Sequence, residues 1–511
     1  MSVGTDTNNT KMVSIENSSF LNSPKDGIRI SVKYTLADNV SASIRNSTFE
    51  GFSFNGIKSI GLKNLIISNC TLSSINNSSV GIFLTQNSNT IIQNCSISSS
   101  NGILSDVTQL AEEEIDNVSI DESIDILSCQ INFSSGFGVS SDRGIYLNNT
   151  GNGIVSLNIE NCSIEGFSNN IYFQNFKYLI PLINNSSLNN FKVNGITALN
   201  GDGIIVSNCS LVSSIASSKR GLFLSNIKNP LILDNTIRVS STVSSPESGI
   251  QMVSSDGAIR RNQISGFLYG IELGGSSPGL AQNIITGNKS CGLYVSSYSM
   301  PDMSRAVIDE DIYPITGYNN IYENGICDLS YSNAEIFLYR SSINMESGCN
   351  TIADDRDSPY LNCVFTFLID GQAVLSDINA QKNYWGNHPA YGHNPELRFG
   401  DEVTVDYDGY LDEPCENSEG GSLLLLSNVS PFFVDSVYST GPIIEPLSVF
   451  ESKISLADKQ YYSNNFSTAK NLYKEIIELF PNISKSSVAY NKLFTLEWGD
   501  SLNVILPPDS R

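Results

Sequence analysis

Residues 69–97, NCTLSSINNSSVGIFLTQNSNTIIQNCSI, contain the two patterns that decide the fold. The first is a polar residue, a small polar residue, any residue and an apolar one, as in Asn69-Cys70-Thr71-Leu72, and it returns 25 residues later at Asn94-Cys95-Ser96-Ile97. The second is a glycine followed by alternating apolar residues, as in Gly81-Ile82-Phe83-Leu84. Such alternation is typical of a β-strand that leaves a bend with one face inward.

Both patterns recur along most of the chain. Successive copies of the first begin 21 to 34 residues apart, and looser copies begin at Asn319, Asn350 and Lys382. The small polar second position is held in turn by Ser18, Ser47, Cys70, Cys95, Cys129, Cys162, Ser186, Cys209, Asn235, Asn262 and Asn283. Two or three short strands in each period predict an all-β solenoid, a right-handed parallel β-helix of about fourteen coils.

Two other repeat architectures fit less well. A leucine-rich repeat has a similar period but needs a fixed Leu-x-x-Leu-x-Leu frame, which is absent. A β-propeller needs a period of roughly forty residues. The β-helix is therefore the predicted fold.

The second position of the repeat is expected to lie in a buried bend, stacked on the same position of the next coil. Stacking lets buried polar side chains bond their neighbours above and below. We expect structural ladders there, with free thiols, at Cys70, Cys95, Cys129, Cys162 and Cys209, and with amides at Asn235, Asn262 and Asn283. The sequence contains no Cys-x-x-Cys pair, so the spacing of the cysteines does not suggest a zinc site. A disulfide among Cys291, Cys327, Cys349, Cys363 and Cys415 stays open.

Composition excludes one class of partner. The 52 acidic and 29 basic residues give a net charge of −23, so the surface repels phosphate backbones and no nucleic-acid partner is expected. No apolar run is long enough to span a membrane, and the first residues do not resemble a signal peptide. We expect an extracellular or cell-surface protein, of which this chain is a fragment with its export signal upstream.

The segment 381–387, Gln-Lys-Asn-Tyr-Trp-Gly-Asn, is followed by Val405-Asp406-Tyr407 and Tyr410-Leu411. This ending resembles the last coils of bacterial surface proteins of the right-handed parallel β-helix repeat family, over residues 13 to about 412. The resemblance implies a β-helix domain at 1–411, with Tyr384 and Trp385 closing the open end of its core. It implies little about activity, because this fold carries lyases, hydrolases, epimerases and adhesins.

The remainder of the chain changes character. Residues 412–450 contain Glu413-Pro414, Gly420-Gly421 and Gly441-Pro442 and are predicted to be a linker. Residues 451–511 have apolar residues at helical spacing, with a break at Asn464-Asn465 and an end at Pro481. They resemble a partial tetratricopeptide-like segment, a short helical hairpin that could bind a protein partner.

No convergent catalytic set is visible in the sequence. The only histidines, His388 and His393, follow Trp385 in one loop, and the Gly-His-Gly motif of polygalacturonases and the Arg-x-Pro-x-x-Arg segment of pectate lyases are absent. Two acidic insertions, 106–125 and 302–311, are predicted to be solvated loops. Asp309, Glu310 and Asp311 are weak candidates for a Ca²⁺ site, and no other cofactor is expected.

The first hypothesis is an exported or cell-surface β-helix without catalytic activity, used for adhesion, for contact with a polysaccharide or cell-surface glycan, or as a stalk. A polysaccharide lyase or glycoside hydrolase acting on an acidic polysaccharide is the alternative, suggested by the fold. The third hypothesis makes the helical segment the binding module and the β-helix a spacer. Catalytic residues stay unassigned.

Overall fold

The computed structural model describes residues 11–32, 40–74, 76–85, 87, 89–106, 122–134, 142–148, 154–176, 179–304, 306–307, 314–325, 334–353, 365–370, 377–385, 397–398, 404–406, 411, 457 and 466–479. The chain divides into two compact units, Met1–Leu424 and Leu425–Arg511. The sequence-predicted boundaries at 411 and 451 stay predictions.

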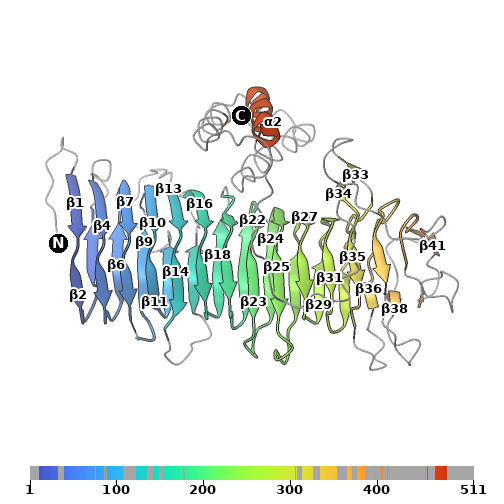
Figure 1. The fold of residues 1–511 in the computed structure, drawn as a ribbon, viewed down its shortest axis with the longest axis horizontal. Coiled ribbons are helices and arrows are strands. Elements are labelled where there is room, and N and C mark those ends of the chain that lie inside the picture. Colours follow the sequence, from blue (N-terminus) through green and yellow to red (C-terminus); the bar gives the residue numbers. More distant parts are fainter. Residues whose placement is uncertain are drawn as a thin grey trace, which may run out of the picture. The chain divides into compact units, whose positions relative to one another are not determined.

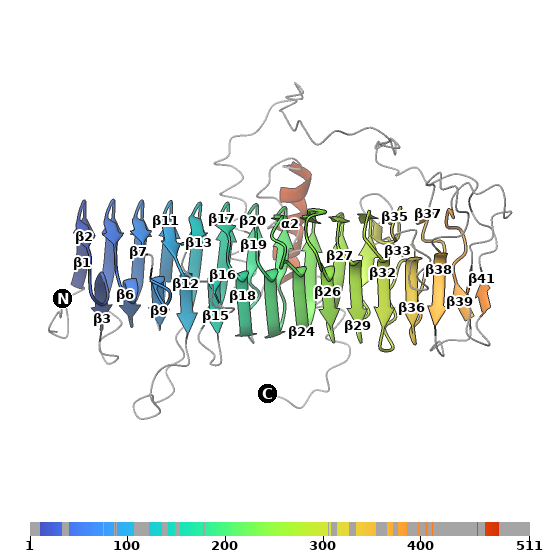
Figure 2. The same ribbon diagram turned by 90° about the horizontal axis from the view of Figure 1, so that it is seen from below.

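The first unit is a parallel β-helix in which each coil contributes strands to three sheets, called A, B and C (Figures 1 and 2). Sheet A holds β1 Lys11–Glu16, β4 Val40–Arg45, β7 Asn64–Ser68, β10 Asn89–Gln93, β13 Glu122–Leu127, β16 Ile154–Glu160, β19 Leu182–Asn184, β22 Ile205–Ser207, the end of β24, β27 Asp256–Arg260 and β30 Gly279–Ala281. Sheet B holds β2 Ser19–Leu21, β5 Thr48–Glu50, β8 Thr71–Ser73, β11 Ser96–Ser99, β14 Gln130–Phe133, β17 Ser163–Glu165, β20 Ser187–Asn189, β23 Ser210–Ser213, β25 Thr236–Val239, β28 Gln263–Ser265, β31 Ile284–Thr286, β35 Asn320–Tyr322 and β37 Thr351–Ala353.

Sheet C is the longest of the three. It holds β3 Ile28–Ser31, β6 Asn55–Ile60, β9 Val80–Thr85, β12 Asn101–Asp106, β15 Arg143–Asn148, β18 Asn169–Phe176, β21 Asn194–Gly201, β24 Arg220–Leu233, β26 Ser248–Val253, β29 Tyr269–Gly274, β32 Cys291–Ser296, β36 Ala334–Tyr339, β38 Phe365–Asp370 and β40 Leu397–Arg398. Every pairing within these sheets is parallel and joins equivalent residues of successive coils, such as Ile57 with Ile82 and Ile82 with Ile103. The fold class predicted from the sequence is confirmed.

The bend between sheets A and B explains the sequence repeat. Its first residue is left-handed, with φ of 53° at both Asn69 and Asn94, a conformation that asparagine tolerates better than most residues. That residue is exposed, whereas the next, Cys70 or Cys95, is buried. The sequence repeat therefore reflects a turn in which one side chain points to solvent and the next points into the core.

Buried thiols occupy this bend in the first half of the helix. Cys70, Cys95, Cys129, Cys162 and Cys209 are free and buried, and each sulfur lies near two backbone carbonyls, as Cys209 Sγ does 3.2 Å from the Ser207 oxygen and 3.7 Å from that of Ile183. The contact to the preceding coil ties adjacent coils together. No metal is needed to explain these cysteines.

Asparagine replaces cysteine in the second half and forms a continuous amide ladder of Asn235, Asn262, Asn283, Asn319, Asn350 and Asn383. Asn262 is fully buried and shows the pattern: its Oδ1 accepts from the backbone N and Nδ2 of Asn235, at 3.0 and 2.9 Å. Its Nδ2 donates to Asn283 Oδ1 at 3.1 Å and to the Ile232 carbonyl at 2.8 Å. The amides from Asn235 to Asn350 are thus held by the coils on either side, and that of Asn383 by the preceding coil and its own.

The last three rungs correct the sequence alignment by one residue at two places. Tyr318 and Cys349, rather than Asn319 and Asn350, occupy the left-handed first position, with φ of 56° and 53°. Asn319 and Asn350 are in the buried second position. The sequence alignment is off by one residue here because Tyr318 and Cys349 stand where the pattern requires a polar first residue. The Asn of the second position follows each of them directly.

Tyr384 and Trp385 are buried, and Trp385 packs into the main core, but they do not form its last layer. Pairing continues beyond them, because β39 Asp377–Asn379 pairs with β41 Thr404–Asp406, and the Leu411 amide donates to the Asn383 carbonyl. The expected end-closing role is therefore wrong: one more coil stacks on theirs. A small antiparallel pair, β33 Ala306–Val307 with β34 Pro314–Thr316, also projects from the coils.

Within the second unit, the helix α2 spans Phe466–Leu479. It begins after Asn464-Asn465 and ends before Pro481, as the sequence predicts. Ala469 and Tyr473, four residues apart, are buried, while Ser467, Thr468 and Asn471 are exposed. The tetratricopeptide-like arrangement and its protein partner stay predictions, and most of the segment, like the linker, lies outside the described residues. No described helix is long and apolar enough to cross a membrane.

We predict that Asn262→Ala lowers the free energy of unfolding by about 3 kcal/mol, because it removes the acceptor of the buried backbone N of Asn235 and one donor to the Ile232 carbonyl. Urea denaturation followed by circular dichroism measures this loss. Thr236→Ala, at an exposed position of β25, is the control and should cost less than 1 kcal/mol. Equal losses for the two variants would contradict a stabilising role for the ladder.

Burial raises the pKa of the Cys209 thiol to about 12. The folded protein therefore keeps a proton that the unfolded chain releases above its ordinary thiol pKa near 9, and stability falls as the pH rises through this window. We predict that Cys209→Ser, which resembles the natural Ser186 one coil earlier, flattens the fall of Tm between roughly pH 8 and 11. Parallel Tm curves for the variant and the original protein would show that the thiol does not carry this effect.

Candidate functional site

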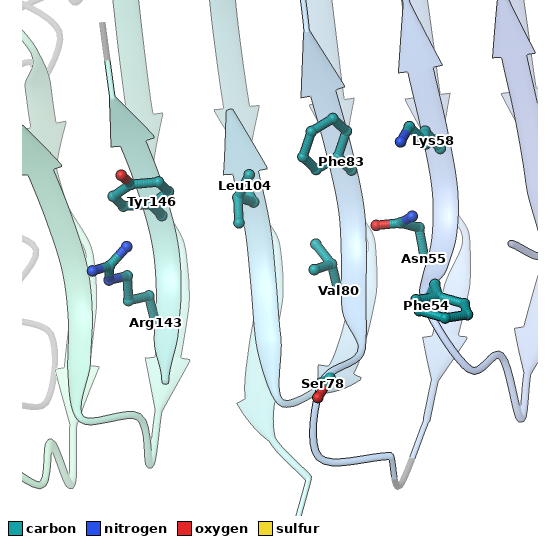
Figure 3. Close-up of a pocket in the computed structure, with 9 residues that line it drawn as sticks. All are labelled: Phe54, Asn55, Lys58, Ser78, Val80, Phe83, Leu104, Arg143 and Tyr146. Carbon is teal, nitrogen blue, oxygen red and sulfur yellow. The ribbon is translucent and has the colours of Figure 1, made fainter. Parts of the chain in front are cut away.

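The outer face of sheet C carries the side chains that the strand alternation leaves pointing to solvent. In each strand the residue after the first buried apolar position points outward, and parallel pairing aligns these residues into a row: Lys58 pairs with Phe83, Phe83 with Leu104 and Leu104 with Tyr146. A second outward row, three residues earlier on each strand, contains Asn55, Val80 and Arg143. Figure 3 shows both rows side by side on β6, β9, β12 and β15.

These rows line a groove of about 400 Å³. Its walls are Phe54, Asn55, Lys58, Ser78, Val80, Phe83, Leu104, Arg143 and Tyr146 (Figure 3). Phe54, at one edge, is 56% exposed although it is a large apolar residue. An exposed ring beside a groove marks a surface suited to contact with another molecule.

Cations and aromatic rings are interleaved in this groove. Lys58 Nζ lies 4.8 Å from the centre of the Phe83 ring. The Arg143 guanidinium carbon lies 4.1 Å from the ring centre of Tyr146 and 4.3 Å from that of Tyr172 on the next strand. The rings hold both cations by cation–π contact while leaving polar hydrogens free for a ligand.

Neither Lys58 nor Arg143 forms an ion pair with a carboxylate of the described residues. Five basic side chains elsewhere on the described β-helix do pair with carboxylates: Arg261 contacts Asp234 through two nitrogens, for example, and Lys228 contacts Asp202 at 2.8 Å. The acidic residue next to Arg143, Asp142, is buried and pairs instead with Lys192 at 3.7 Å; burial raises the pKa of this carboxyl, and Lys192 opposes the rise. The groove is thus a local positive site on an acidic protein.

The groove lining found in the described part of the chain contains no Asp or Glu. A glycoside hydrolase needs two carboxylates flanking the scissile bond. The described lining therefore suits contact with an anion or a sugar ring.

The sequence alone did not assign any residue of this groove to a functional site. The weak metal candidates Asp309, Glu310 and Asp311 lie outside the described residues, as do His388 and His393. Among the described residues there is no group of three or more His, Cys, Asp or Glu side chains placed to hold a metal ion. Cys349 is disulfide-bonded and Cys291 is free and buried, while Cys327, Cys363 and Cys415 also lie outside the described residues.

Comparison with known proteins identifies the family. The model of the right handed beta helix region matches residues 3–143 and 143–308, more than half of the chain. The chain belongs to this family of right-handed β-helix proteins. None of the curated proteins matches the sequence.

Two solved structures resemble the chain weakly. A mutant of the periplasmic alginate epimerase AlgG is 15% identical, with a TM-score of 0.36, and the match covers 73% of this chain and 77% of that one. The A-module of the mannuronan C-5 epimerase AlgE6 from Azotobacter vinelandii is 11% identical, with a TM-score of 0.29, over 80% of this chain and 91% of that one. Likeness at this level carries no information about activity.

Proposed function

We propose that this protein is an exported or cell-surface β-helix that binds an acidic polysaccharide in the groove on sheet C. The observation that carries the proposal is the pair of cations without carboxylate partners, Lys58 and Arg143, set among exposed and half-buried aromatic rings. Aromatic faces stack on the apolar faces of sugar rings, and guanidinium and ammonium groups pair with carboxylates. Uronic acids carry both features in one unit.

The surrounding charge makes the groove selective. The chain has a net charge of −23, so a polyanion is repelled by most of the surface and meets attraction where cations are not neutralised. A flexible polysaccharide with widely spaced carboxylates fits such a site better than a nucleic acid, whose dense phosphates would meet the acidic surface on either side.

We predict that Lys58→Ala and Arg143→Ala each weaken binding of a tetrauronate about tenfold, a change of roughly 1.4 kcal/mol. Isothermal titration calorimetry at low and high salt measures it, and the affinity of the unmodified protein should fall as salt rises. Lys63→Ala is the matched control, because Lys63 is exposed and lies outside the groove. Tetrauronate binding that survives both groove substitutions, or equal binding of a neutral tetrasaccharide, would contradict the proposal.

One observation favours a lyase as the second candidate. Tyr146 lies directly beside Arg143, so the guanidinium can neutralise the carboxylate of a bound uronate while the Tyr146 side chain, deprotonated to the phenolate, takes the proton from the adjacent carbon and becomes the phenol. The freed electron pair would form a double bond, the glycosidic carbon–oxygen bond would break, and water would protonate the leaving oxygen.

The two candidates differ in the product. Incubation of the protein with the polysaccharide, followed by ultraviolet absorbance of the new double bond, detects a lyase, and Tyr146→Phe should then abolish turnover while keeping binding. If the full chain binds the polysaccharide but forms no unsaturated product, the binding function is supported and the lyase is excluded.

A further inference from the structure

The outward row of the groove continues without a break along sheet C. In parallel register it passes through Arg29, Lys58, Phe83, Leu104, Tyr146, Tyr172, Thr197, Phe223, Gln251, Glu272, Tyr294 and Phe337. Its charged residues are sorted: Arg29 and Lys58 lie at the β3–β6 end, and Glu272 lies on β29. Between them stand aromatic, hydroxyl and amide side chains. The row therefore changes from positive to neutral to negative along the axis.

The second row differs along the axis in how its cations are paired. Arg143 on β15 has no acidic partner among the described residues, whereas Arg220 on β24 and its neighbour Lys219 both contact Glu247. Ser248, on the following strand, donates a hydrogen bond to the Glu272 carboxylate. Asp26, the carboxylate beyond the other end of the groove, accepts from Asn55 Nδ2 at 2.7 Å. Attraction for an anion is thus concentrated over β6–β15 and is cancelled from β24 onward.

The stretch between these regions is uncharged: Asn194 and Thr197 are buried, and Asn169, Tyr172, Phe223 and Gln251 are the partly exposed side chains. Asn194 Nδ2 donates to Asn169 Oδ1 at 3.1 Å and to Thr197 Oγ1 at 2.9 Å, fixing a small amide and hydroxyl network on β18 and β21. Phe223 and Gln251 follow in the outward row, both half-buried. Such groups suit the hydroxyls and apolar faces of neutral sugars.

We propose that the face selects a polysaccharide by the position of its charges: acidic residues bind over β6–β15, and the chain continues as neutral residues toward β29. This rests on the proposed function. Strands of one sheet are about 4.8 Å apart, so the groove is about 14 Å long and Glu272 lies about 24 Å beyond it. A 1,4-linked sugar chain advances by a similar distance for each residue, so about four residues fill the groove and about nine reach Glu272.

The test compares three ligands by calorimetry at low salt: a tetrauronate, a dodecauronate, and a dodecamer with four uronates followed by eight carboxyl-reduced, neutral residues. The block dodecamer should bind about tenfold tighter than the tetrauronate, since its neutral part gains contacts. The dodecauronate should gain little over the tetramer, because its further carboxylates meet no unpaired cation in the row before they reach the carboxylate of Glu272. Glu272→Gln should raise the affinity for the dodecauronate about threefold and leave the tetrauronate unchanged.

The control is Glu50→Gln, which removes an exposed carboxylate from sheet B, on a different face. It should change none of the three affinities. Equal affinities for the two dodecamers would overturn the charge-position proposal, and so would a Glu272→Gln variant in which the ratio of these two affinities is unchanged. Tetrauronate binding through Lys58 and Arg143 would still support the proposed function in either case. Absence of tetrauronate binding would overturn both.

Discussion

The structure depends on the in-register stacking of the buried bend between sheets A and B. A tight bend turns backbone and side-chain polar groups inward, where each unsatisfied group would cost roughly 1–3 kcal/mol. In this protein the coil above and the coil below satisfy them, through thiols near carbonyls in the first half and the amide ladder from Asn235 to Asn383 in the second. Bonds within one coil, such as that from Asn262 to the Arg260 carbonyl, satisfy only part of each bend, so each coil depends on its neighbours for the rest.

The same register creates the outer surface. Because equivalent residues align from coil to coil, outward side chains far apart in sequence form continuous rows on sheet C, and Lys58 and Arg143 line one groove although they are 85 positions apart in the sequence. A substitution on one strand therefore changes one step of a row and leaves its neighbours in place. A rigid scaffold of this kind suits the recognition of a long, regular ligand, because the repeat of the protein and the repeat of a sugar chain have similar lengths.

Charge gives this surface its direction. The protein as a whole is acidic, and some cations of the β-helix are neutralised by nearby carboxylates, as Arg220 is by Glu247. Over β6–β15 the aromatic rings of Phe83, Tyr146 and Tyr172 replace carboxylates as the partners of the cations. A ring supports a cation without cancelling its charge, and this leaves an attractive site for a carboxylate from outside.

The sequence by itself determined the β-helix, the bends and the buried cysteines and asparagines, because a strand alternates with period two and a left-handed bend accepts few residues, so both leave a local signature. It misplaced the rungs at Asn319 and Asn350, where Tyr318 and Cys349 hide that signature, and it could not show that another coil covers Trp385. The groove was decided only by the tertiary structure. Lys58, Phe83, Arg143 and Tyr146 look like ordinary outward residues in their own strands, and only the number of residues in each coil determines which of them become neighbours.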